Sequence, residues 1–282
     1  MNRVFCNLIA FLAVGTVPLL AAETAATVTE AVNKVSHGTS QTSSTAPATK
    51  GTQIQAGEYL ETGVKSRAEL QLADQTITRL GANTVFNYSV ANNEVDLQSG
   101  TILFSKPKEG KPMTIKTSAV TAAIVGTTGF LQLIGKHFIF GLVEGHATLT
   151  IGGVTYPLGP GEVIRLTNGA PPSTFFFNLS AFVSSSPLMT GFHSQLPNQP
   201  FIDKEVAEFN ELVSRGFVSP ITGPYFNFDL NGAVPTVPIP GTDSAGSAHG
   251  LFNTPPPPPP PPRESGPSSI LVHPAPTGSS SS

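Results

Sequence analysis

The chain has 282 residues, of which 12% are charged, and its formal net charge is −3 at pH 7. Nucleic-acid binding depends on clustered Lys and Arg side chains that neutralise phosphates, so this composition argues against a nucleic-acid partner. The single cysteine, Cys6, leaves the rest of the chain without a thiol, which excludes disulfides, thiolate metal sites and cysteine redox chemistry there.

The first 22 residues have the pattern of an export signal. Arg3 gives a positive start, residues 8–20 form an apolar run, and Ala21 and Ala22 are small residues suited to cleavage. The run is shorter than the roughly 18–20 residues that span a bilayer, so a transmembrane anchor is the less favoured alternative. We therefore expect a cleaved signal peptide, a periplasmic or extracellular location, and no stable membrane insertion afterwards.

The next segments differ sharply in composition. Residues 23–50 are rich in Ala, Thr and Ser with few large apolar side chains, which predicts a flexible lead-in. From residue 51 short strands follow one another, and in residues 66–72 apolar and polar side chains alternate as in a half-buried strand. Turn-forming residues separate these strands through residue 167, so residues 51–167 predict an all-β domain.

Four short segments of this domain share an apolar residue, two spacers, a glycine and an apolar tail. Their glycines are Gly57, Gly100, Gly145 and Gly161. Because glycine adopts the backbone angles of a tight turn without a Cβ clash, each segment would turn the chain between consecutive strands. Repeated strand–turn units favour a solenoid-like stack of short strands. The spacing is irregular, so a β-sandwich with similar turns is the alternative.

Beyond the β domain, residues 168–219 form a loosely patterned segment that contains one clear element. Residues 203–215 predict an amphipathic helix, with Asp203 as its cap and with an apolar face of Val206, Phe209, Leu212 and Val213. This helix either packs on the β domain or remains free to bind a partner.

Residues 220–282 are rich in Pro, Gly and Ser and predict a disordered tail. Its eight consecutive prolines, residues 255–262, would form a polyproline II rod about 25 Å long at ~3.1 Å per residue. Such a rod is a spacer or a ligand for a proline-binding domain.

Side chains able to carry out chemistry do not form a recognisable catalytic or metal-binding pattern. The six histidines include no His-x-His and no pair four residues apart, and a metal site from His137 and His146 would need further ligands. Glu94 and Asp96 share a strand face and are interpreted as solvated, and residues 126–129 lack the lysine of a phosphate loop. We therefore expect a protein that is not an enzyme and that uses no cofactor or metal.

The densest basic cluster lies around a predicted turn and consists of Lys106, Lys108, Lys111 and Lys116. We interpret it as a solvated loop. A contact with an anion or a partner is the alternative.

Weak motifs occur in a fixed order between residues 51 and 166. They are Gly51-x-x-Ile54-x-x-Gly57-Glu58, Ser66-Arg67-Ala68-Glu69-Leu70, Arg79-Leu80-Gly81, Val95-x-Leu97-x-x-Gly100, Val125-Gly126-Thr127, Val143-Glu144-Gly145 and Leu158-x-x-Gly161-Glu162. Together they resemble the FecR domain of bacterial envelope proteins. Two departures are Gln75, where the family has glycine after the aspartate, and the two residues that separate Gly126-Thr127 from Phe130. The first predicts a different type of turn at Asp74.

The resemblance implies binding rather than catalysis. Regulators of this family also have a cytoplasmic sigma-factor-binding segment and a membrane helix, and this sequence has the pattern of neither. We expect an exported, non-enzymatic binding module or scaffold of the bacterial cell envelope that recognises a protein or a glycan through its FecR-like β domain. The alternatives are a signalling accessory or sensor that acts on a membrane partner, and a structural envelope protein. No motif indicates which residues contact the partner.

Overall fold

The structure, a computed structural model, describes residues 23–39, 45–117, 120–167 and 170–221. The expected signal peptide and nearly all of the expected disordered tail, including its polyproline run, lie outside these ranges. Within the described ranges, no helix is long and apolar enough to cross a membrane.

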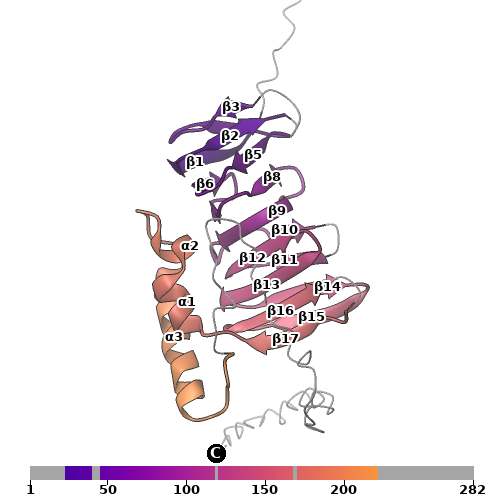
Figure 1. The fold of residues 1–282 in the computed structure, drawn as a ribbon, viewed down its shortest axis with the longest axis vertical. Helices are drawn as coiled ribbons and strands as arrows, with labels where there is room; N and C mark the ends of the chain where they lie inside the picture. Colours follow the sequence, from indigo (N-terminus) through magenta and orange to yellow (C-terminus); the bar gives the residue numbers. More distant parts are fainter. Residues whose placement is uncertain (1–22, 40–44, 118–119, 168–169, 222–282) are drawn as a thin grey trace, which may run out of the picture. The chain divides into compact units, whose positions relative to one another are not determined.

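The described strands pair into one continuous 17-stranded sheet that folds into two layers, called sheets A and B, which share one long strand (Figure 1). Sheet A contains, in spatial order, β4 (Gln53–Gln55), β1 (Thr24–Val32), β6 (Arg67–Leu72), β7 (Ile77–Leu80), β9 (Glu94–Ser105), β12 (Thr128–Ile134), β13 (His137–Glu144), β16 (Glu162–Thr167) and β17 (Ser173–Phe176). Sheet B contains β3 (Ala46–Pro47), β2 (Val35–Gly38), β5 (Tyr59–Thr62), β8 (Val85–Ser89), β9 again, β10 (Met113–Lys116), β11 (Val120–Ile124), β14 (Ala147–Ile151) and β15 (Val154–Leu158). These pairings are antiparallel, except for that of β9 with β10.

Strand β9 belongs to both sheets because the chain crosses from one to the other at Gly100. Residues 94–99 pair with β8 in sheet B, and residues 100–105 pair with β12 in sheet A. Gly100 has a φ of +95°, and a Cβ there would lie 2.4 Å from the Cα of Thr84. Only glycine meets both the backbone and the space requirement at this crossing.

The other three glycines of the repeated segment lie at crossings of the same kind. Gly57 lies between β4 and β5, Gly145 between β13 and β14, and Gly161 between β15 and β16, all with positive φ. Each of these strand pairs joins sheet A to sheet B. The expected all-β stack of short strands is confirmed, and it also has the two packed sheets of the alternative, a β-sandwich.

One apolar core fills the space between the two sheets. Its larger side chains come from alternate positions of both sheets and include Leu70, Leu80, Phe104 and Phe140 from sheet A and Phe86, Leu97, Ile115 and Leu149 from sheet B. The period-two pattern of the sequence is the pattern of this core, because successive side chains of a strand point to opposite faces.

The expectation of a flexible lead-in over residues 23–50 is wrong for the described part of that segment. Strand β1 lies between β4 and β6 in sheet A, and β2 pairs with β5 in sheet B. Ala25, Ala26 and Val28 are buried in the core although they are small. Small side chains suffice here because the strands are stabilised mainly by their ladders with distant strands.

The turn at Asp74 also differs from expectation. Gln75 has a φ of +68°, the left-handed conformation that glycine adopts most readily. The turn therefore keeps the backbone conformation that favours glycine, at a cost of roughly 1–2 kcal/mol for a residue with a Cβ.

Three helices cover the outer face of sheet A: α1 (Leu179–Ser185), α2 (Pro187–Thr190) and α3 (Gln199–Ser214) (Figure 1). We call residues 178–214 the helical strap. A second apolar cluster joins it to the sheet through Leu103, Phe130, Val143 and Val163 of the sheet and Phe182, Leu188, Ile202 and Phe209 of the strap. The predicted helix is confirmed as α3, and it packs on the β domain rather than remaining free. It begins before Asp203, after the N-cap residue Asn198.

Candidate functional site

The outer face of sheet A holds a buried ion pair beneath the strap. The Nε atom of Arg79 in β7 lies 2.8 Å from Oε2 of Glu69 in β6, and the two side chains are 1% and 2% exposed. The guanidinium also donates to the carbonyl oxygens of Leu188 and Met189, both at 2.9 Å, and of Ser194 at 2.5 Å. Leu188 and Met189 lie in α2, whose last carbonyls have no partner within the helix.

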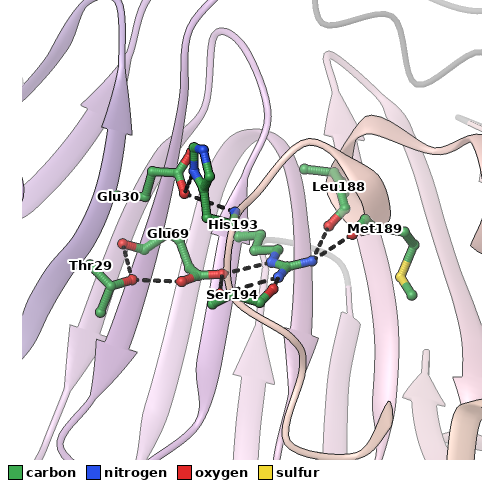
Figure 2. A network of polar contacts seen from close by, with 8 residues as sticks. Thr29, Glu30, Glu69, Leu188, Met189, His193 and Ser194 are labelled. Atoms are coloured by element: carbon green, nitrogen blue, oxygen red, sulfur yellow. Dashed lines mark hydrogen bonds and ion pairs between the residues drawn. The ribbon is translucent and has the colours of Figure 1, made fainter.

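Both oxygens of the Glu69 carboxylate also accept hydrogen bonds from hydroxyl groups. The hydroxyls of Ser194 and Thr29 donate to it at 2.5 and 2.8 Å. Figure 2 shows Glu69 between Thr29 of β1 and the strap, with the guanidinium reaching the carbonyls of Leu188 and Met189. A buried ion pair is stable only when its remaining hydrogen-bonding capacity is met, as it is here. This network joins the strap to sheet A, and it gives both charged groups of the Glu69–Arg79 pair structural partners.

A second contact lies beside this pair, at the edge of the same network (Figure 2). The main-chain N–H of His193 donates to Oε2 of Glu30 at 3.1 Å, and the ring Nδ1 lies 3.0 Å from the same oxygen. Burial alone would raise the pKa of Glu30, but these hydrogen bonds, with the charges of His193 and Arg67, hold it below its ordinary value. The aromatic ring of Phe192 also lies 4.8 Å from the Arg79 guanidinium carbon.

The strap has another polar anchor at the start of α3. The side-chain amide of Asn198 donates to the carbonyl oxygen of Lys106 at 2.8 Å and to Oε2 of Glu144 at 3.1 Å. Oε1 of Glu144, a residue that is 1% exposed, forms an ion pair with Lys108. Glu144 is thus held by one cation and one amide, which explains how a carboxylate can be buried between the strap and the sheet.

The basic cluster of the sequence is divided by this arrangement, and its interpretation as a solvated loop is wrong for Lys106. That side chain is 1% exposed and its ammonium donates to Oδ2 of Asp74 at 2.6 Å. Burial alone would raise the pKa of Asp74, but the hydrogen bonds from Lys106 and Thr76 and the Lys106 charge lower it below 3.8. With Lys106 and Lys108 committed to internal ion pairs, the four lysines do not form one anion site.

The outer face of sheet B is different because its side chains reach solvent. The strand registers align them in two rows across the sheet. One row contains Asn87, Asp96, Lys116, Thr121, Thr150 and Thr155, and the other contains Ser89, Glu94, Thr114, Ala123, Thr148 and Pro157. Every one of these residues is exposed or partly exposed. The described helices pack on sheet A, so this polar surface is the open face of the stack.

The open face contains a hollow of about 540 Å³ across β8, β9 and β10. Its polar lining includes Asn87, Glu94, Asp96, Gln98 and Lys116, and it also borders the core side chains of Leu97 and Leu133. The Lys116 ammonium lies 3.9 Å from Oε1 of Glu94, and the Gln98 amide donates to Oδ2 of Asp96 at 3.4 Å. Glu94 and Asp96 do share the solvated face that the sequence indicates, and the structure adds that they line a concave part of it.

The terminal strands of the two sheets are poor templates for another strand. In sheet B, β3 has two residues and ends in Pro47, and β15 contains Pro157. In sheet A, β4 has three residues, and next to β17 the N–H of Ile221 donates to the carbonyl oxygen of Phe176 at 2.9 Å. Short, proline-containing or covered edges disfavour strand addition. The open face of sheet B is therefore the better candidate for recognition.

The other residues weighed from the sequence do not come together as a reactive site. His137 begins β13 and His146 lies in the turn that follows that strand. Among the described residues, no group of three His, Cys, Asp or Glu side chains could hold a metal ion. The segment around Gly126 is the turn between β11 and β12, where the Thr127 hydroxyl donates to the carbonyl oxygens of Val125 and His146. His249 and His273 lie outside the described residues.

Comparison with known proteins supports the resemblance found in the sequence. The family described as FecR protein matches residues 58–148, so the chain contains a FecR domain. The match begins just before β5 and ends in β14, and it includes neither β1 and β2 nor the helical strap. No curated protein matches the chain.

Two solved structures resemble part of the fold, and both are of a "putative anti-sigma factor" from Parabacteroides distasonis ATCC 8503. One has a TM-score of 0.39 at 17% identity and covers 42% of this chain and 59% of that chain. The other has a TM-score of 0.41 at 16% identity and covers 44% and 63%. The chain thus spans less than two thirds of the length of either structure.

Proposed function

We propose that the chain is an exported, non-enzymatic binding module of the bacterial cell envelope, and that it recognises a protein or a glycan through the open face of sheet B. The contrast between the two outer faces carries this proposal. Sheet A is covered by a strap that two polar anchors and an apolar cluster hold in place. Sheet B presents two rows of mostly polar side chains that packing does not require.

Binding is favoured over catalysis because the deeply buried charges have structural partners. Arg79, Glu69 and Glu144 each have their hydrogen-bonding groups engaged between the strap and sheet A. An active site needs a titratable group that is available to substrate and whose pKa suits proton transfer. The periplasmic or extracellular location is proposed from the signal pattern of residues 1–22.

A signalling accessory is the second candidate, and the FecR match over residues 58–148 favours it. In that case the partner of the open face would be a membrane protein. The two candidates share a binding surface and differ in the partner, so one experiment can separate them.

The test is site-specific photo-crosslinking of the tagged full-length protein in cells, followed by mass spectrometry. A photoreactive residue replaces Thr121 on the open face, and a matched control replaces Asn210 on the exposed side of α3. We expect one saturable partner from position 121 and none from position 210. A membrane-spanning partner would favour the signalling role. The same abundant envelope components from both positions would overturn specific recognition and favour a structural role.

A further inference from the structure

The hollow on the open face has the size and the position of a small-molecule site. Its volume of about 540 Å³ lies within the range of roughly 300–1,000 Å³ that is common for such sites. Its polar walls come from adjacent strands: Asn87 of β8 is opposite Asp96 of β9, and Asp96 is opposite Lys116 of β10. Since these strands are central in sheet B, the walls are positioned by ladders on both sides.

The lining combines donors and acceptors at short spacing. The amides of Asn87 and Gln98 and the ammonium of Lys116 can donate, while the carboxylates of Glu94 and Asp96 can accept. The Asn87 amide already donates to the carbonyl oxygen of Glu58 at 2.6 Å, so its second N–H is the one it can offer to a ligand. A hydroxyl group both donates and accepts, so two neighbouring hydroxyls of a sugar ring can pair with a carboxylate and an amide at once. A purely anionic or purely cationic ligand would leave one half of this set unpaired.

Other ligand classes fit the same groups less well. A phosphate would lie between two carboxylates and one ammonium, so it would meet net repulsion. A divalent cation prefers several oxygen ligands, but only two carboxylates line the hollow, and Lys116 lies 3.9 Å from one of them. A large apolar ligand would bury polar groups without partners.

The hollow offers little apolar surface to a sugar ring. Leu97 and Leu133 border it, but both belong to the core and are only 1% and 8% exposed. Among the described residues, the lining contains no aromatic side chain on which a ring could stack. Affinity for a single sugar unit should therefore be modest, with a Kd of about 1 mM or weaker.

We propose that this hollow binds one unit of a hydroxyl-rich glycan, with Asp96 and Asn87 pairing with neighbouring hydroxyls. The proposal rests on the proposed function of the open face and names the ligand class for its concave part. It assigns a role to Glu94 and Asp96 beyond that of solvated charges.

The test is titration of the full-length, isotope-labelled protein with glucose, galactose, N-acetylglucosamine and cellobiose, followed by NMR of the backbone amides. We expect saturable shifts in β8, β9 and β10 with at least one sugar. Asp96→Asn and Asn87→Ala should each weaken binding about tenfold, since each removes one paired hydrogen bond. Thr148→Ala is the matched control, because Thr148 lies on the same face outside the hollow, and it should leave binding unchanged.

The absence of saturable shifts at tens of millimolar sugar, or shifts that Asp96→Asn does not weaken, would overturn the glycan proposal. The urea midpoint of each variant, measured in parallel, shows that the variant is folded. If sugars do not bind but position 121 still crosslinks to one protein, the binding function stands and its partner is a protein. If neither sugars nor a specific protein is captured, the proposed function fails as well.

Discussion

The two outer faces of this stack follow the same strand geometry, yet one is buried and the other is open. On sheet A the outward side chains include Leu103, Phe130 and Val163, which pack under the helical strap. On sheet B the outward positions carry residues such as Asp96 and Thr150, which remain in contact with solvent. The inward positions of both sheets are apolar because the common core requires it. The two sheets therefore differ at their outward positions. Apolar outward side chains on sheet A pack against the strap, whereas polar outward side chains on sheet B remain available for binding.

The largest expected effect comes from breaking the ion pair under the strap. Arg79→Ala should lower the free energy of unfolding by about 3–5 kcal/mol, because it leaves the Glu69 carboxylate buried without its cation. Urea denaturation of the full-length protein measures this. Arg215→Ala, which breaks the exposed Arg215–Glu211 pair, should cost at most about 0.5 kcal/mol. Equal losses in the two variants would contradict the anchoring role of Arg79.

A smaller effect is expected where the strap meets a sheet crossing. Gly161→Ala would place a Cβ 2.2 Å from Cε2 of Phe209 in α3, at a φ of +77°. The combined overpacking and backbone strain should cost about 2–4 kcal/mol and increase hydrogen exchange in α3. Gly152→Ala is the matched control, since its φ is +56° and a Cβ there has no atom within 4 Å. It should cost only about 1 kcal/mol, and α3 should be unaffected.

The pH dependence of stability should report on the ion pair between Lys106 and Asp74. The pKa of Asp74 is lowered in the folded protein, so its contribution to stability is present above the ordinary value of 3.8 and is lost as the pH falls through the lower folded value. Asp74→Asn should therefore be less stable at neutral pH and should lose less stability on acidification below pH 3.8. Asp203→Asn, on the exposed side of α3, is the matched control for the loss of one carboxylate. An unchanged slope in Asp74→Asn would refute this contribution.

The smallest effect on stability is expected on the open face. Asp96→Asn and Thr150→Ala should change the free energy of unfolding by no more than about 0.5 kcal/mol, because neither side chain is needed for packing. The same substitutions should weaken photo-crosslinking from position 121. If either substitution lowers the stability as much as Arg79→Ala does, the outward side chains of sheet B are needed for folding, as those of sheet A are.

Patterns that are local in the sequence predicted much of the core. The alternation of apolar and polar residues over 66–72 predicted strand β6, and the four repeated glycines predicted turns, which the structure shows to be crossings between the sheets. Both predictions succeeded because each pattern involves only residues that are adjacent in the sequence. The strands of the first segment were missed because their burial depends on distant partners rather than on large side chains: β1 pairs with β6, and β2 with β5.

The anchors of the strap could not be predicted for a related reason. Arg79 reaches carbonyls 109 and 110 positions away in the chain, and main-chain carbonyls have no signature in a sequence. Arg79 and Glu69 occupy outward positions of their strands, as Glu94 and Asp96 do, so the local pattern does not distinguish a buried pair from exposed charges. Charged residues at such positions are rarely buried unless they are paired. The side-chain pattern likewise places Glu94 and Asp96 on one face, but the hollow requires three strands that are brought together by pairing.

The strand shared by the two sheets has a consequence for how the protein unfolds. Half of β9 is hydrogen-bonded within sheet B and the other half within sheet A, with Gly100 between them. The two sheets are therefore joined by the continuous backbone of this strand and by the apolar core that both of its halves pack against. Such coupling makes the stack a single cooperative unit rather than two foldons that open in turn. Denaturation followed by probes in either sheet should give coincident transitions, and a mechanical load applied to one sheet would pass through β9 to the other.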